Sequence, residues 1–112
     1  MADAGNLYSA TPGHLLEELV EVLGGGGDTR VERIVSRGHR SPPGFWYDQP
    51  LEELVLLLQG RARLSLADPD EEVELDPGDW LRIRARRRHR VEATDPQGDT
   101  VWLAVHYPDP AP

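Results

Sequence analysis

Residues 78–89 read Gly-Asp-Trp-Leu-Arg-Ile-Arg-Ala-Arg-Arg-Arg-His and follow directly on Asp76-Pro77. The Pro-Gly-Asp turn opens a strand, because proline and glycine favour turns and alternating apolar residues follow them. Upstream, Glu53 precedes Gly60 with an apolar strand between them. This pair of elements is typical of a small β-barrel. We expect it to bring the Glu53 carboxylate and the His89 imidazole, which are distant in sequence, into one pocket.

On both sides of this run the sequence alternates between short strands and tight turns. Turns rich in Gly, Pro and Asp separate the segments, for example at residues 67–70, 76–79 and 95–99. Short strands divided in this way favour an all-β sandwich or closed barrel. The expected strands cover residues 31–36, 51–58, 62–66, 71–75, 80–84, 88–94 and 100–107.

The N-terminal part of the chain predicts a helix. Thr11 is expected to cap it and Pro12 to occupy its first turn. Apolar residues then follow at helical spacing, and the run Gly24 to Gly27 is expected to end the helix and form a flexible link. We therefore divide the chain into an N-terminal arm, helix and glycine linker (1–29), a barrel (30–107) and a frayed tail (108–112). The apolar helix face comprises Leu15, Leu16, Leu19, Val20 and Leu23, and Glu17, Glu18 and Glu21 lie on the other side.

Composition limits the class of protein. A length of 112 residues suits one domain with one core. The chain has no cysteine, which excludes disulfides and thiolate metal sites. No apolar run is long enough to cross a bilayer, so we expect a cytoplasmic protein without a membrane partner. A net charge of −8 argues against nucleic acid as a partner.

All 12 basic residues are arginine, and six of them fall within residues 82–90. They form either a solvated barrel edge paired with nearby acids or a rim that attracts anions to the pocket. Arginine binds carboxylates and phosphates in a bidentate manner. Under the second interpretation Arg84 is a candidate ligand contact.

The two elements resemble the sequence motifs of the cupins, which are small jelly-roll barrels. Glu53 to Gly60 fits the end of the first motif, and Gly78 to His89 fits the spacing of the second. The second motif departs from the family where Arg84, Arg86 and Ala93 stand in place of its usual Pro, Gly and Asn. The chain is similar to small stand-alone bacterial cupins. The resemblance implies an all-β, cupin-like jelly-roll barrel, to which the N-terminal amphipathic helix is added.

The first motif also lacks the two histidines that the family places before the glutamate. Depending on spacing, these positions hold Trp46 and Asp48, or Tyr47 and Gln49. The resemblance therefore implies a reduced metal site for zinc, manganese, nickel or iron, with open positions for water or substrate. Its candidate ligands are Asp48, Gln49, Glu53, His89 and His106.

His106 joins this set through strand alternation, since Trp102, Ala104 and His106 share one face of the last strand. If the small Ala104 faces the interior, His106 does too. The alternative is a metal-free barrel in which Glu53 and His89 form a hydrogen-bonded pair. Glu52, which points away from Glu53, is expected to be an exterior charge.

Trp46 and Tyr47 are candidate ligand-binding residues beside the pocket, although packing in the core or at a dimer contact is the first explanation for each. Two functions stay open. One is a non-catalytic module that binds a small molecule, with or without a metal. The other is a metal-dependent enzyme (oxygenase, isomerase or lyase) acting on a small organic acid or sugar derivative. A homodimer is expected because free sheet edges favour pairing.

Overall fold

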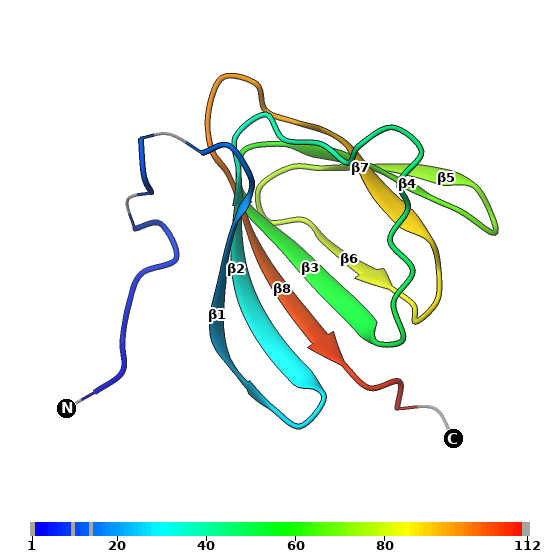
Figure 1. Cartoon of the computed structure of the whole chain (residues 1–112), viewed down its shortest axis with the longest axis horizontal. Coiled ribbons are helices and arrows are strands. Elements are labelled where there is room, and N and C mark those ends of the chain that lie inside the picture. Colours follow the sequence, from blue (N-terminus) through cyan, green and yellow to red (C-terminus); the bar gives the residue numbers. More distant parts are fainter. Residues whose placement is uncertain (1, 10, 14, 111–112) are drawn as a thin grey trace.

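The structure is a computed structural model that describes residues 2–9, 11–13 and 15–110. Eight strands and no helix occur in this part of the chain, so the all-β class is confirmed (Figure 1). The structure describes no helix long and apolar enough to cross a membrane. The strands are β1 (Leu19–Gly26), β2 (Thr29–Ser36), β3 (Glu52–Gln59), β4 (Ala62–Leu66), β5 (Glu71–Leu75), β6 (Trp80–Ile83), β7 (His89–Thr94) and β8 (Thr100–Tyr107).

Two antiparallel sheets face each other. One has five strands in the order β1-β2-β8-β3-β6, and the other has three in the order β5-β4-β7. Figure 1 shows the small sheet lying across one end of the larger one. Their facing sides enclose the core, which consists of Val55, Leu57, Ala62, Leu64, Leu66, Leu75, Ile83, Trp102 and Ala104.

The predicted N-terminal helix is wrong, because residues 19–26 form the edge strand β1 instead. Leu19 pairs with Val35 and Gly26 with Thr29, so the pairing with β2 replaces helical hydrogen bonds. The proposed apolar helix face is not buried as one surface, since Leu16 and Leu23 are 83% and 53% exposed. Gly24 to Gly26 lie within the strand and not in a flexible link, and a turn at Gly27 leads into β2. His14, which was expected on the helix, lies outside the described residues.

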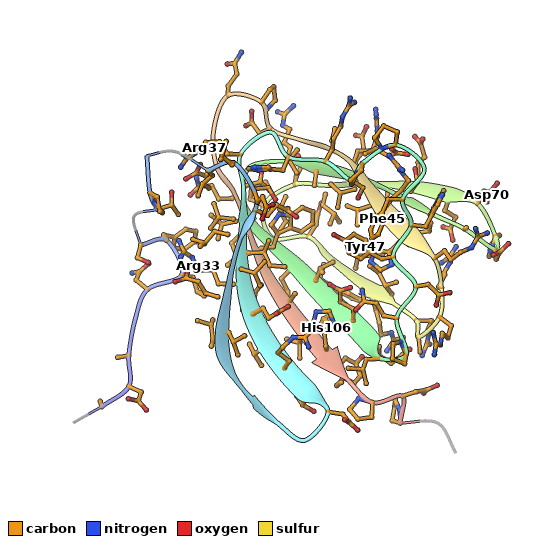
Figure 2. All side chains as sticks on the ribbon, viewed as in Figure 1. Arg33, Arg37, Phe45, Tyr47, Asp70 and His106 are labelled. Atoms are coloured by element: carbon orange, nitrogen blue, oxygen red, sulfur yellow. The ribbon has the colours of Figure 1, made fainter. Side chains whose placement is uncertain are left out.

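The N-terminal arm is held against the larger sheet by two arginines (Figure 2). Arg33 donates to the carbonyl oxygens of Leu7 and Ser9 at 2.9 and 2.7 Å and pairs with Glu21. Arg37, which follows β2, donates to the Pro12 carbonyl at 3.1 Å and to Thr11 Oγ1 at 2.8 Å. It also pairs with Asp99 at 2.7 Å, and this guanidinium holds the pKa of the Asp99 carboxyl below its usual range. The contacts of Arg33 with the arm explain why an arginine is buried within β2.

Glu52 is not the exterior charge that strand alternation predicts. Its side chain does point away from Glu53, but the residue is only 1% exposed. The loop after β6 folds over it, and its carboxylate accepts hydrogen bonds from the Ala85 amide and, at 3.2 Å, from Arg84. Burial here comes from a covering loop, which alternation along one strand does not reveal.

Candidate functional site

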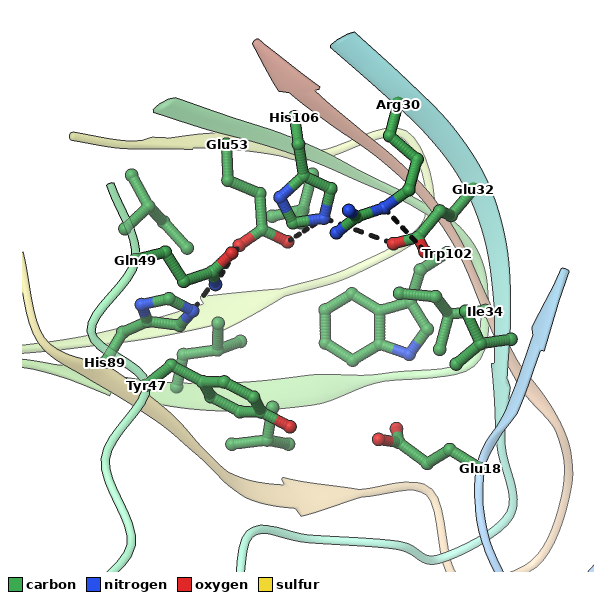
Figure 3. A pocket seen from close by; sticks show the side chains of 15 residues that line it. Glu18, Arg30, Glu32, Ile34, Tyr47, Gln49, Glu53, His89, Trp102 and His106 are labelled. Atoms are coloured by element: carbon green, nitrogen blue, oxygen red, sulfur yellow. Dashed lines mark hydrogen bonds and ion pairs between the residues drawn. The ribbon is translucent and has the colours of Figure 1, made fainter. Parts of the chain in front are cut away.

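A cavity of about 300 Å³ lies between the two sheets. One end is polar and carries side chains from β2, β3, β7 and β8 (Figure 3). The remaining wall is apolar and aromatic. It consists of Ile34, Val55, Leu64, Ile83, Val91 and Trp102, with Val20 and Tyr47 more exposed. The volume is at the lower end of the range of small-molecule sites.

Glu53 and His89 meet at the polar end, as the two motifs predict. His89 Nε2 lies 3.5 Å from Glu53 Oε1, and Gln49 Nε2 donates to the same oxygen at 3.3 Å. The other ring nitrogen of His89, Nδ1, lies 3.3 Å from the Arg87 carbonyl oxygen. A carbonyl can only accept, so Nδ1 carries a hydrogen. In a neutral ring Nε2 then presents a lone pair to a carboxylate, and a proton or a cation must lie between them.

His106 completes the polar end from β8. Trp102, Ala104 and His106 are 4%, 0% and 5% exposed, so the inward orientation inferred from the small Ala104 is confirmed. His106 Nε2 lies 3.2 Å from Glu32 Oε1 and 3.8 Å from Glu53 Oε2. Its Nδ1 is the one buried side-chain nitrogen or oxygen without a hydrogen-bond partner among the described residues.

Glu53 stays ionised at neutral pH despite its burial. Burial raises the pKa of its carboxyl, but the contacts with His89 and His106 outweigh this, and the net pKa is lowered. Burial and the charges of Glu18 and Glu53 raise the pKa of Tyr47. The cavity therefore presents a carboxylate and a neutral phenol.

The structure selects between the two spacings left open before Glu53. Tyr47 and His89 form a backbone bridge, with N to O distances of 2.7 and 3.1 Å, and their rings stack 5.2 Å apart. Because side chains alternate along an extended segment, Tyr47 and Gln49 line the cavity. Asp48 pairs with Arg86 outside it at 3.4 Å.

Trp46 and Arg84 also lie away from the cavity. The Trp46 ring contacts the guanidinium groups of Arg88 and Arg90 at 5.6 and 5.9 Å, which is a packing role. Arg84 pairs with Glu52 on the other face of β3. The arginines of residues 84–90 are therefore tied to neighbouring acids, as the first of the two interpretations expects.

Three charged residues that line the cavity were not predicted from the sequence, namely Glu18, Arg30 and Glu32. Arg30 pairs with Glu32 at 3.0 Å. Alternation in β2 places both on the same face as Ile34, so a charge pair on a core-facing side was the available signal. Glu18 was assigned to the exposed side of the expected helix, which concealed its role.

The donors at the polar end suit a divalent transition metal chemically, since two imidazoles and a carboxylate are typical ligands. The unpaired Nδ1 of His106 and the lone pair that His89 directs at Glu53 fit this interpretation. In the described residues, however, no three His, Asp or Glu side chains converge on a common point. The side chains bond to one another instead, so binding a metal requires them to exchange hydrogen bonds for coordination.

Comparison with known proteins places this geometry in context. A family model described as a cupin domain matches residues 34–106. The search of curated proteins returned no match.

Solved structures give closer parallels. A "putative mannose-6-phosphate isomerase" from Ralstonia eutropha JMP134 is 40% identical, with 96% of this chain and 100% of that chain covered and a TM-score of 0.92. A cupin superfamily protein from Desulfitobacterium hafniense DCB-2 is 20% identical over 88% and 84% of the two chains (TM-score 0.71). Hydroxypropylphosphonic acid epoxidase from S. wedmorenis shares only the fold, at 14% identity over 80% and 50% of the chains (TM-score 0.68).

Proposed function

Since the chain belongs to the cupin family, we propose that it binds a small organic molecule in the cavity with the help of a divalent transition metal. Glu53, His89 and His106 are the proposed metal ligands, and Gln49, whose side-chain nitrogen donates to Glu53 at 3.3 Å, is a further candidate. The observation that carries the proposal is the position of His89, whose Nε2 lies 3.5 Å from Glu53 Oε1 while Nδ1 lies 3.3 Å from the Arg87 carbonyl oxygen.

The donor set does not choose among zinc, manganese, nickel and iron, because imidazole and carboxylate bind all four. Structures named for Fe(II) and Co(II) forms of HppE, the hydroxypropylphosphonic acid epoxidase, illustrate that the fold can hold such ions. Asp48 is not part of the proposed set, since it lies outside the cavity. The apolar and aromatic wall supports the second half of the proposal, namely an organic ligand beside the metal.

A metal titration tests the site. At pH 7.5 we expect wild type to bind about one zinc ion per chain, and His89→Ala and His106→Ala each to weaken binding at least roughly tenfold. His39→Ala is the matched control, because His39 lies outside the cavity and should leave affinity unchanged. Affinity should also fall as the pH is lowered, since protons compete for the imidazole lone pairs. Wild type that binds no zinc, nickel, manganese or iron would contradict the metal half of the proposal.

A metal-dependent enzyme is the second candidate, and the name of the Ralstonia protein favours it. A bound divalent metal would polarise a substrate oxygen. The discriminating assay incubates metal-loaded protein with mannose 6-phosphate. Turnover that is lost in His89→Ala supports an isomerase, whereas stoichiometric metal without turnover supports a binding module.

We also propose a homodimer that pairs through the free edge of β1. This strand bonds only to β2, and its Val22 and Leu23 are 65% and 53% exposed. Sedimentation at micromolar concentration should give a dimer for wild type and for the isosteric control Val22→Thr. Val22→Lys should give a monomer, because a charge at a strand edge opposes pairing. A monomeric wild type would refute the proposal.

A further inference from the structure

The cavity has an excess of negative charge. Glu18, Glu32 and Glu53 line it together with one guanidinium, that of Arg30, which is already bound to Glu32 at 3.0 Å. Three carboxylates therefore share the cavity with a single guanidinium. Charges in an enclosed cavity interact more strongly than charges in bulk water.

No other arginine among the described residues compensates this charge, because Arg30 is the only one that lines the cavity. Those of the loop and strand that follow β6 bind acids elsewhere. Arg87, Arg88 and Arg90 pair with Glu71, Asp68 and Glu92 at 2.8, 3.1 and 2.9 Å. In the metal-free cavity a phosphate or carboxylate would therefore meet repulsion and find no free bidentate partner.

Glu18 is the carboxylate whose role the metal proposal leaves unexplained. Trp102 Nε1 donates to Ser36 Oγ at 3.1 Å, and the Ser36 hydroxyl donates to Glu18 Oε2. Among the residues that the structure describes, Glu18 has no ion-pair partner. A divalent ion at Glu53 would balance the charge of the polar end, but it would leave Glu18 uncompensated.

Aromatic surface separates these two ends. In the pairing of β2 with β8, His106 faces Arg30 and Trp102 faces Ile34, while Ser36, which holds Glu18, faces Thr100. Trp102 thus lies between the levels of His106 and Glu18 along the sheet. Figure 3 shows the Trp102 indole in the middle of the cavity, with the Tyr47 hydroxyl directed towards the side that carries Glu18. Aromatic faces attract cations.

We infer that the cavity takes a small organic cation, an amine whose ammonium group pairs with Glu18 and whose apolar body packs against Trp102 and Tyr47. This inference rests on the proposed function in that it names the class of molecule held in the same cavity. It assigns a cationic group, and not a phosphate, to the end of the cavity that carries Glu18.

Calorimetric titration with three probes of similar shape tests this inference, using the full chain with and without zinc. Phenethylamine supplies a cation, 2-phenylethanol a neutral group and phenyl phosphate an anion. We expect phenethylamine to bind roughly tenfold more tightly than 2-phenylethanol, which is the order of magnitude of one partly buried charge pair. Phenyl phosphate should not bind the zinc-free protein, in which it meets only repulsion. Glu18→Gln should remove the preference for the amine. Glu17→Gln, the same change at an exposed neighbour outside the cavity, should keep it.

The outcomes separate this inference from the metal site. Zinc affinity should be the same in Glu18→Gln as in wild type. If zinc fails to bind but the preference for the amine depends on Glu18, only the metal proposal falls. The inference is overturned if the amine does not bind at millimolar concentration, if phenyl phosphate binds as tightly, or if Glu18→Gln leaves the preference unchanged.

Discussion

Replacing Gly60 by alanine is expected to cost about 2–5 kcal/mol of folding stability. Gly60 has a φ of +87°, which costs an L residue about 1–2 kcal/mol. A Cβ there would also lie 2.4 Å from Thr100 Oγ1 and 2.8 Å from Thr100 Cα. Thr100 is fully buried, so this overlap must displace the backbone of β8, at about 1–3 kcal/mol. The sum is a large part of the stability of a small domain.

Gly78 provides the control for this prediction, because it is the other glycine of the two motifs. Its φ is +94°, but a Cβ there would meet nothing within 4 Å. Gly78→Ala should therefore cost only the conformational part, about 1–2 kcal/mol. Chemical denaturation of the three proteins measures both losses. Equal losses of folding stability in the two variants would show that the overlap with Thr100 adds nothing to the cost of Gly60→Ala.

The strands from β2 onwards could be predicted because each depends on local information. Residues 100–107 follow a turn that contains Pro96 and Gly98, and the alternation along the strand divides them between two faces. The small Ala104 then identifies the inner face, and with it the orientation of His106. The pairing of Glu53 with His89 came from another source, namely the resemblance of their two elements to the cupin motifs.

β1 could not be predicted, because the apolar residues of residues 15–23 fit a helical period as well as a strand. The segment forms a strand and not a helix because the edge of β2 pairs with Leu19–Gly26. That edge is not visible in the local sequence. The error also concealed Glu18, since a helix and a strand direct this side chain to different places.

The choice between Trp46 with Asp48 and Tyr47 with Gln49 needed a contact across the fold. Which side chains of an irregular segment point inwards depends on its first pairing, here the bridge from Tyr47 to His89. A similar limit applies to Glu52. Alternation predicts the face it occupies, whereas the loop at Arg84 and Ala85 determines that this face is covered.

Glu52 and Glu53 are neighbours on β3, but removing their charges is expected to affect different properties. Glu53→Gln should reduce zinc affinity, and Glu52→Gln should reduce folding stability. Glu53→Gln should weaken zinc binding by roughly 100-fold or more, beyond the 10–100-fold typical of residues outside the coordination shell. The reason is that an amide oxygen replaces the charged ligand that faces both His89 and His106. Glu52→Gln should leave zinc affinity unchanged, because its carboxylate lies on the other face of the strand.

Stability should show the reverse order. Glu52→Gln replaces a charged acceptor of the Ala85 amide and of Arg84, and should cost about 1–2 kcal/mol. The contribution of Arg84 to this loss is small, since its side chain is 61% exposed and its charge is screened by water. Glu53→Gln should change the stability of the metal-free protein less than Glu52→Gln does. Zinc titration and urea denaturation of both variants give four measurements from one pair of adjacent residues. If Glu52→Gln reduced zinc affinity as much as Glu53→Gln, zinc affinity would depend only on the overall stability of the barrel. Glu53 would then not be a ligand.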